Sequence, residues 1–332
     1  MTATSLDLST PRFSLLLCRF VAWSLVATLF VFLLNIYLTF WRGWPSAGSA
    51  FGSNSTIFSW LQILSYAVGF VFAALFVRAT ISRTLRQDNI TITAIAAYIA
   101  RFAFWTVFLI GIVDAVISFL RVEEMLGVYV SADLVQALGR SQFRGPYVHL
   151  PLIVLALIIA AFSRSLGFTW LAVLVVVAEL QIVISRFVFS YEQAFMGDLV
   201  RFWYAGLFLF SSAYTLVEEG HVRVDVLYHG FSEHTRGMVN ALGALFLGLP
   251  LCWVILILGM GQASSIITSP LLALEISQQG FGMYVKYLMA AMLAVFAVTM
   301  AIQFAAYFLE GVADYCGLPG KRQIEIHSET TA

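Results

Sequence analysis

The sequence predicts an all-α, polytopic membrane bundle of about eight transmembrane helices, together with an amphipathic surface helix. Of the 332 residues, 61% are hydrophobic and only 11% are charged, whereas a soluble domain carries about 25% charged residues. Apolar segments recur along the whole chain, and most approach the roughly 20 residues that a helix needs to cross the hydrocarbon layer. Composition and segment length therefore both indicate an integral membrane protein.

The first half of the chain contains four expected spans, at residues 20–40, 57–77, 94–120 and 147–163. The apolar run of the first span exceeds that of a signal peptide, and no small-residue cleavage site follows it, so we expect it to be retained. The third span contains Arg101 and Asp114. Pro151 lies in the first turns of the fourth span, where a missing backbone N–H costs least.

The second half contains four more expected spans, at residues 165–185, 199–217, about 236–261, and 287–309. Glu179 lies inside the first of these, and a bend is expected at Pro250 in the third. The segment "GQASSIITSPLLALEISQQGFG" is expected to form an external loop, after which Lys286 marks the boundary of the last span.

Orientation follows from the distribution of basic residues, because cytoplasmic loops carry an excess of Lys and Arg. A cytoplasmic N-terminus places most of the 18 Lys and Arg residues inside. With eight spans, both termini then face the cytoplasm. The net charge is zero, so we expect no nucleic acid as a partner. Because the chain spans the membrane, we expect it to contact membrane lipid.

The segment after the third span has a different pattern. In "RVEEMLGVYVSADLVQALGRSQFRGP", apolar residues recur at helical spacing between charged ones. The pattern predicts an amphipathic helix near 122–140 that lies on the external face of the membrane. A short soluble loop helix is the alternative.

Three charged side chains, those of Arg101, Asp114 and Glu179, lie inside expected spans away from the span ends, and a charge at a helix centre costs roughly 2.5–3.5 kcal/mol. The long stem of Arg101 is expected to reach the inner surface. Arg121 and Arg186 follow Asp114 and Glu179 at the spacing of two helical turns, which places each pair on one face but about 10 Å apart. The two acids could form a proton or cation relay, or they could make buried contacts with neighbouring helices. We favour buried contacts, because a carrier gathers convergent polar groups and broken helices near the midplane.

Short catalytic motifs are absent from the sequence. It contains no hydrolytic triad motif, Walker loop, HExxH or GxGxxG, and we therefore expect neither enzymatic activity nor a cofactor. Three scattered cysteines have no metal-ligand spacing. The irregular group His221, His229 and His234 could bind a metal, but a solvated loop is the interpretation that we favour.

The segment "SSAYTLVEEGHVRVDVLYHGF" concentrates charges in an otherwise apolar chain. It resembles the signature of the small membrane subunit of tripartite ATP-independent periplasmic (TRAP) transporters, the DctQ-type component. The matching hexapeptide is GHVRVD, which comprises Gly220, His221, Val222, Arg223, Val224 and Asp225. The resemblance covers residues 168–312, about half of the chain. The chain resembles a longer variant of this subunit. We expect an N-terminal four-helix extension over 1–165, a DctQ-like domain over 166–312 and a cytoplasmic tail over 313–332.

This resemblance implies a non-catalytic subunit in the bacterial inner membrane. Its implied partners are the large membrane subunit (DctM-type), which moves substrate in an elevator-like motion driven by sodium, and a periplasmic substrate-binding protein for organic acids. Gly220 would let the backbone leave the preceding helix. The alternation of polar and apolar residues after it would suit docking to a partner, although an ordinary solvated turn is the alternative.

The competing functions are a self-sufficient secondary carrier that uses Asp114 and Glu179, and a membrane enzyme or redox subunit.

Overall fold

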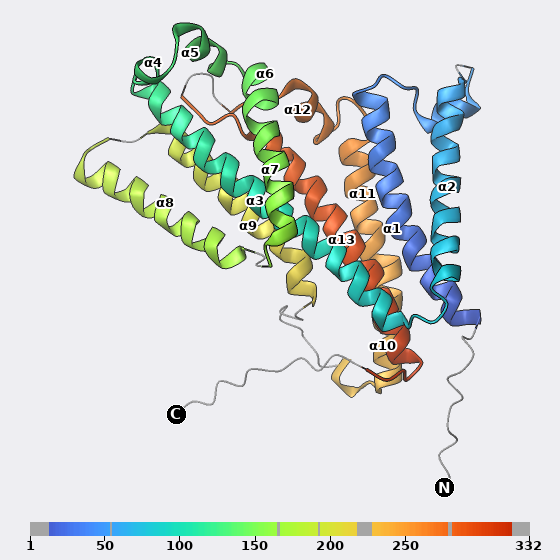
Figure 1. Cartoon of the computed structure of the whole chain (residues 1–332). Helices are drawn as coiled ribbons and strands as arrows, with labels where there is room; N and C mark the ends of the chain where they lie inside the picture. Colours follow the sequence, from blue (N-terminus) through green and yellow to red (C-terminus); the bar gives the residue numbers. More distant parts are fainter. Residues whose placement is uncertain are drawn as a thin grey trace, which may run out of the picture. The chain divides into compact units, whose positions relative to one another are not determined.

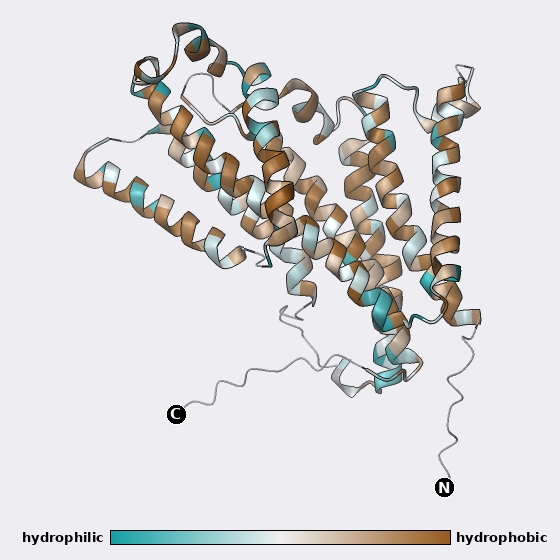
Figure 2. Cartoon of the chain, viewed as in Figure 1, coloured by the Kyte–Doolittle hydropathy of each residue, from teal (hydrophilic) through white to brown (hydrophobic). Residues whose placement is uncertain are grey.

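A computed structural model describes residues 13–53, 55–164, 167–191, 193–217, 228–277 and 281–320. Over these residues the chain is helical, with turns and loops between helices and no strand (Figure 1). Hydrophobic residues dominate the long helices, whereas the N-terminal end of α3 and helix α10 are among the hydrophilic segments (Figure 2). The predicted all-α membrane class is confirmed.

Seven helical segments of the described chain are long and apolar enough to cross a membrane. They are α1 (Phe13–Phe40), α2 (Ile57–Ala79), α3 (Leu85–Val122), the segment Ser141–Phe162 that contains α6 and α7, α8 (Phe168–Val188), the segment Glu233–Met260 that contains α10 and α11, and α13 (Lys286–Tyr315). Each corresponds to an expected span. The remaining expected span is helix α9 (Ala194–Val217), which has 24 residues but is less apolar, because it carries Asp198, Arg201 and several tyrosines and serines.

Two spans contain a π-helical turn just before a proline. One turn, Gly145–His149, precedes α7 (Leu150–Phe162) with Pro151, and the other, Ala244–Gly248, precedes α11 (Leu249–Met260) with Pro250. A proline removes a backbone donor and crowds the carbonyl one turn earlier, and a π turn is one way in which a helix absorbs this disruption. The irregularity expected at Pro250 therefore takes this form.

The expected amphipathic helix near 122–140 is divided into two short helices. They are α4 (Leu126–Tyr129) and α5 (Ala132–Leu138), followed by α6 (Ser141–Arg144). Val130 and Ser131 between them have extended ψ angles of 161° and 156°, and Glu124 has a positive φ of 56°. Ser131 sits at the N-cap position of α5, a position that serine favours with an extended backbone. Helical periodicity in the sequence did not reveal this break.

The described residues group into two compact units that interleave along the chain. Unit 1 draws on Met1–Ala94, Thr215–Leu251 and Ala301–Ala332, and unit 2 on Ile95–Tyr214 and Cys252–Met300. Both units therefore combine residues from the two halves of the sequence. The division expected near residue 165 stays a prediction.

In unit 1, α1 and α2 form a hairpin joined by a buried polar seam. The Asn35 amide donates to the Ser65 hydroxyl over 3.1 Å, and the Gln62 amide donates to the Thr39 hydroxyl over 3.0 Å. Such bonds between helices satisfy side chains that would otherwise be stranded in an apolar layer. They fix how the two helices face each other.

A second contact in unit 1 brings α10 (Glu233–Gly243) against the C-terminal part of α13. A Cβ placed on Gly237 would lie 2.4 Å from the Tyr315 nitrogen, and one on Gly311 would lie 2.7 Å from the Ala241 nitrogen. Only residues without side chains allow this approach. The two glycines therefore set the spacing of the two helices.

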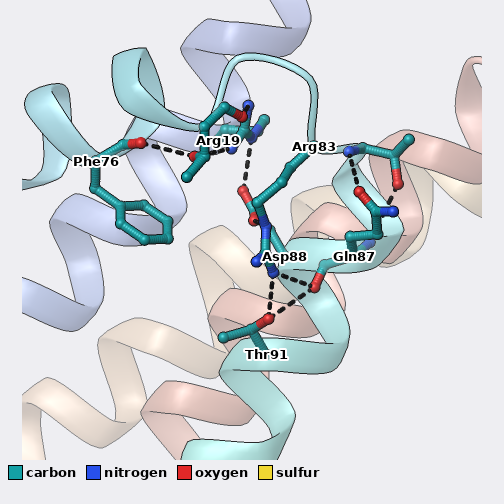
Figure 3. A network of polar contacts seen from close by, with 8 residues as sticks. Arg19, Phe76, Arg83, Gln87, Asp88 and Thr91 are labelled. Atoms are coloured by element: carbon teal, nitrogen blue, oxygen red, sulfur yellow. Dashed lines mark hydrogen bonds and ion pairs between the residues drawn. The ribbon is translucent and has the colours of Figure 1, made fainter.

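The ends of the unit 1 helices also carry a network of charges around the buried Asp88 carboxylate (Figure 3). The Asp88 carboxylate accepts from Arg19 Nε over 2.6 Å and from Arg83 Nε over 2.9 Å. Arg19 also donates to the carbonyl and hydroxyl oxygens of Thr80, and Arg83 donates to Thr91. The network joins α1, the end of α2 and the start of α3.

Unit 2 contains an apolar core. Helices α3, α8, α9 and α13 contribute side chains to it, among them Phe104, Leu171, Phe202 and Met292. Gly167 precedes α8 with a φ of +78°, and a Cβ there would lie 2.5 Å from the Phe104 ring. Only 11% of the most apolar window of α8 is buried, compared with 56% for α13, so α8 leaves most of its surface exposed.

Candidate functional site

The most densely bonded polar site within unit 2 surrounds Asp114, in the interior of α3. Its side chain is fully buried. One carboxylate oxygen lies 2.7 Å from Arg144 Nη1 and 3.0 Å from His149 Nε2. The other oxygen accepts the backbone N–H of Tyr284 over 2.8 Å. Both carboxylate oxygens are therefore bonded, with a cation among the partners.

Arg144 and His149 reach Asp114 from the two ends of one irregular turn. Arg144 ends α6, and His149 ends the π-helical turn Gly145–His149. A π turn closes its hydrogen bonds between residues five apart, which is the separation of these two residues. The irregular geometry ahead of Pro151 thus presents both side chains to the same carboxylate.

The Arg144 guanidinium is held on several sides. Nε donates to the Leu138 carbonyl over 2.7 Å, and Nη1 also lies 3.3 Å from the Ser118 hydroxyl. Its Cζ sits 4.1 Å from the centroid of the Tyr284 ring. A desolvated cation over an aromatic face gains a favourable electrostatic contact. The ring and the carboxylate together accommodate the buried charge.

His149 extends the cluster to α13. Its Nδ1 lies 2.6 Å from the Tyr287 hydroxyl, and both side chains are buried. An ionised carboxylate only accepts, whereas a tyrosine hydroxyl can donate. A neutral imidazole with its proton on Nε2 therefore satisfies the chain from Asp114 through His149 to Tyr287.

Chemically, this cluster is a buried ion pair in which both carboxylate oxygens are bonded, whereas Arg144 Nη2 is buried without a hydrogen-bond partner in the described part of the chain. A buried pair persists only when good geometry and additional hydrogen bonds offset the desolvation of both charges, and the contacts of Asp114 and of the other two guanidinium nitrogens contribute to that offset. The cluster joins α3, the π turn and the N-terminal end of α13. The partners of Asp114 come from segments distant in the sequence.

Arg121, predicted to share a helix face with Asp114, bonds elsewhere. Its Nη1 donates to the Tyr284 hydroxyl over 3.1 Å, and that hydroxyl donates to the Gly139 carbonyl over 2.7 Å. Arg121 thus supports Tyr284, whose backbone N–H bonds Asp114. The two residues meet through Tyr284 and not directly.

The second predicted acid, Glu179, does not join this cluster. It is exposed on α8, as is Arg186 near the end of that helix, and no ion pair or hydrogen bond of Glu179 occurs within the described residues. Asp114 is buried. The structure therefore does not bring the two acids into a common relay.

Arg101 and Lys286 each have an identified contact. The Arg101 Nε donates to the Ala160 carbonyl over 3.4 Å, near the C-terminal end of α7, where carbonyls lack partners within the helix. Lys286 Nζ lies 2.5 Å from the Glu275 carboxylate, and both side chains are partly exposed.

The hexapeptide from Gly220 to Asp225, including His221 and Arg223, lies outside the described residues. Of the histidine group, only the side chain of His234 is described. It stacks on Tyr315, with ring centroids 3.9 Å apart, and its Nδ1 lies 2.6 Å from the Tyr315 carbonyl. The described ranges contain no group of three or more His, Cys, Asp or Glu that could hold a metal.

The fold and the buried charges define a polytopic helical membrane protein with structural ion pairs inside its helix bundle. Residues 172–314 match the family model described as tripartite ATP-independent periplasmic transporters, DctQ component. The resemblance indicated by the sequence is confirmed for this segment. No curated protein matches the chain, and no solved structure does.

The matched segment contributes only part of the Asp114 cluster. Tyr284 and Tyr287 lie inside it, whereas Asp114, Arg144 and His149 precede it. Within unit 2, helices from the N-terminal half are therefore bonded directly to the DctQ-like segment.

Proposed function

We propose that this chain is the small, non-enzymatic membrane subunit of a TRAP transporter in the bacterial inner membrane. The observation that carries the proposal is the match of residues 172–314 to the DctQ component. The helices long and apolar enough for a membrane support it as well. Both termini face the cytoplasm in this proposal, as the distribution of Lys and Arg favours.

The subunit acts as a scaffold and not as a conducting element. In support, both carboxylate oxygens of Asp114 are already bonded, by Arg144, His149 and a backbone N–H, and its charge is paired with that of Arg144. Glu179 is exposed on α8, outside that cluster. A transport site is formed by polar groups that converge near the membrane midplane. Asp114 and Glu179 do not converge in this way.

The partners in this proposal are a large elevator-type membrane subunit (DctM-type) and a periplasmic substrate-binding protein, in a sodium-driven importer of organic acids. The GHVRVD segment docks the large subunit on the cytoplasmic side. Its alternation of polar and apolar residues supports this role, because an extended segment then displays a charged edge to a partner and an apolar edge to the helix ends.

Co-purification from cells that express the chain with its neighbouring reading frames tests the proposal. We expect a larger polytopic protein to be retained with the tagged chain in detergent, and Arg223→Ala or Asp225→Ala to weaken that retention without loss of membrane insertion. Purification of the chain alone would contradict the proposal. Gradient-driven uptake by the chain alone in liposomes, abolished by Asp114→Asn or Glu179→Gln, would establish the carrier alternative.

A further inference from the structure

Helix α8 presents an uncovered face near its middle. Its buried share, 11%, is the smallest among the seven apolar helical segments of the described chain, and the others reach 22% or more. Val176, Glu179, Leu180 and Val183 follow the i, i+3, i+4, i+7 spacing of a single helix face, and all four are exposed. We call these four residues the Glu179 face.

Glu179 places a charge close to the middle of the 21-residue helix α8. Figure 2 shows that this helix is mostly hydrophobic with hydrophilic interruptions. The Glu179 side chain makes no hydrogen bond or ion pair within the described residues. A charge at this depth in a span is costly, and such residues pair with another charge or with a carbonyl. Glu179 therefore needs a partner that the described part of this chain does not supply.

Other charges inside the helices of this chain are paired. Asp114 pairs with Arg144, and Arg19 pairs with Asp88. Helix α2 is also largely exposed, but its one charged residue is Arg78, in the last turn. The exposed surface of α2 is thus suited to lipid, whereas the Glu179 face places a carboxylate where lipid tails would offer it nothing.

The Glu179 face lies in the part of the chain that matches the DctQ component, residues 172–314. A partner that is common to this family has to contact the matched part, since the preceding helices lie outside it. Val176 and Val183 also suit protein contact, because a β-branched side chain has few rotamers to lose when it packs.

We infer that the Glu179 face docks against a transmembrane helix of the large subunit, with Glu179 paired to a lysine or arginine at the same depth. The inference rests on the proposed function and names the surface and the chemistry of that contact. Charge complementarity fixes the register of the two helices, and the apolar side chains around Glu179 supply the packing that holds helices together in lipid.

The first test measures how much of the larger polytopic protein the tagged chain retains in detergent after co-expression. Loss of one member of a desolvated charge pair is costly, so Glu179→Gln should reduce retention at least about tenfold. Glu179→Lys should reduce it further, because it places two like charges together. Glu124→Gln is the matched control. It removes another exposed acid of unit 2, beyond the end of α3, and should leave retention unchanged.

A photo-crosslinking test locates the contact without removing the charge. A photoreactive phenylalanine derivative in place of Val183 should crosslink this chain to the larger protein in native membranes. The same derivative in place of Phe72, an exposed residue of α2, should not. Crosslinking from position 72 and not from position 183 would overturn the inference.

The outcomes separate this inference from the proposed function. If wild type retains no larger protein, the proposed subunit role itself fails. If wild type and Glu179→Gln retain it equally, the subunit role stands and only the docking role of the Glu179 face is refuted, which would indicate a carboxyl group that faces lipid.

Discussion

Asp114 on α3 and Arg144 at the end of α6 form an ion pair of 2.7 Å in which neither side chain is exposed. Removal of one partner strands the other charge in a buried site, which costs about 3–5 kcal/mol. We expect Asp114→Asn and Arg144→Gln to lower the free energy of unfolding by this amount, measured by denaturant titration in detergent micelles.

Glu179→Gln is the matched control, because it also neutralises an acid within a predicted span but at an exposed position. It should change the free energy of unfolding by no more than about 0.5 kcal/mol. Equal losses in Asp114→Asn and Glu179→Gln would contradict the assignment of Asp114 to a buried, structural pair.

The two arginines on Asp88 should differ in importance. The Arg19 side chain is 2% exposed, whereas that of Arg83 is 33% exposed. Solvent screens the second pair, so Arg83→Gln should cost about 0–1 kcal/mol, whereas Arg19→Gln should cost about 3–5 kcal/mol. Thermal unfolding of the two variants in the same detergent checks this order, and a larger loss for Arg83→Gln would refute it.

Gly237 and Gly311 should tolerate no side chain. A methyl group at either position would meet backbone atoms of the facing helix at 2.4–2.7 Å, so Gly311→Ala should destabilise the protein by about 1–3 kcal/mol or more through overpacking. At Gly243, on the same α10, a Cβ meets nothing within 4 Å. Gly243→Ala should instead stabilise it by about 0.5–1 kcal/mol. The melting temperatures of the two variants should move in opposite directions.

Arg86 should hold the C-terminal end of α13 in place. It pairs with Glu310 and Asp314, and its Nε and Nη2 donate to the carbonyls of Pro319 and Leu318. In Arg86→Gln, we expect amide hydrogen exchange across 310–319 to accelerate about tenfold, which corresponds to a loss of about 1.4 kcal/mol in local stability. Arg78→Gln, at an exposed position on α2, should leave that exchange unchanged.

Much of the fold could be predicted from the sequence, because length and hydropathy decide whether a helix can span a membrane. The bend expected at Pro250 coincides with a π turn just before that proline, whereas the π turn before Pro151 was not expected, because that proline lies in the first turns of its span. The break at Ser131 could not be predicted, since helical periodicity continues across it and the extended backbone depends on local geometry.

The Asp114 cluster could be predicted only in part. The sequence indicates that Asp114 is a charge inside a span and favours a buried contact with a neighbouring helix, but it does not identify the partner, since Arg121 on the same helix face lies about 10 Å away. The actual partner, Arg144, belongs to the segment between the third and fourth expected spans. Its burial depends on a π turn and on the approach of α6 to α3, and neither leaves a local signal in the sequence beyond the prolines at 146 and 151.

The bond from the Tyr284 amide to Asp114 has a consequence for any attempt to isolate a minimal fragment. Trimming the chain to the portion that matches the transporter family would remove Asp114 and His149, which bond the Tyr284 N–H and the Tyr287 hydroxyl. Either group, if left in an apolar environment without a partner, would cost about 1–3 kcal/mol. We therefore expect a shortened version to need a polar environment or new partners at Tyr284 and Tyr287 before it could stand by itself.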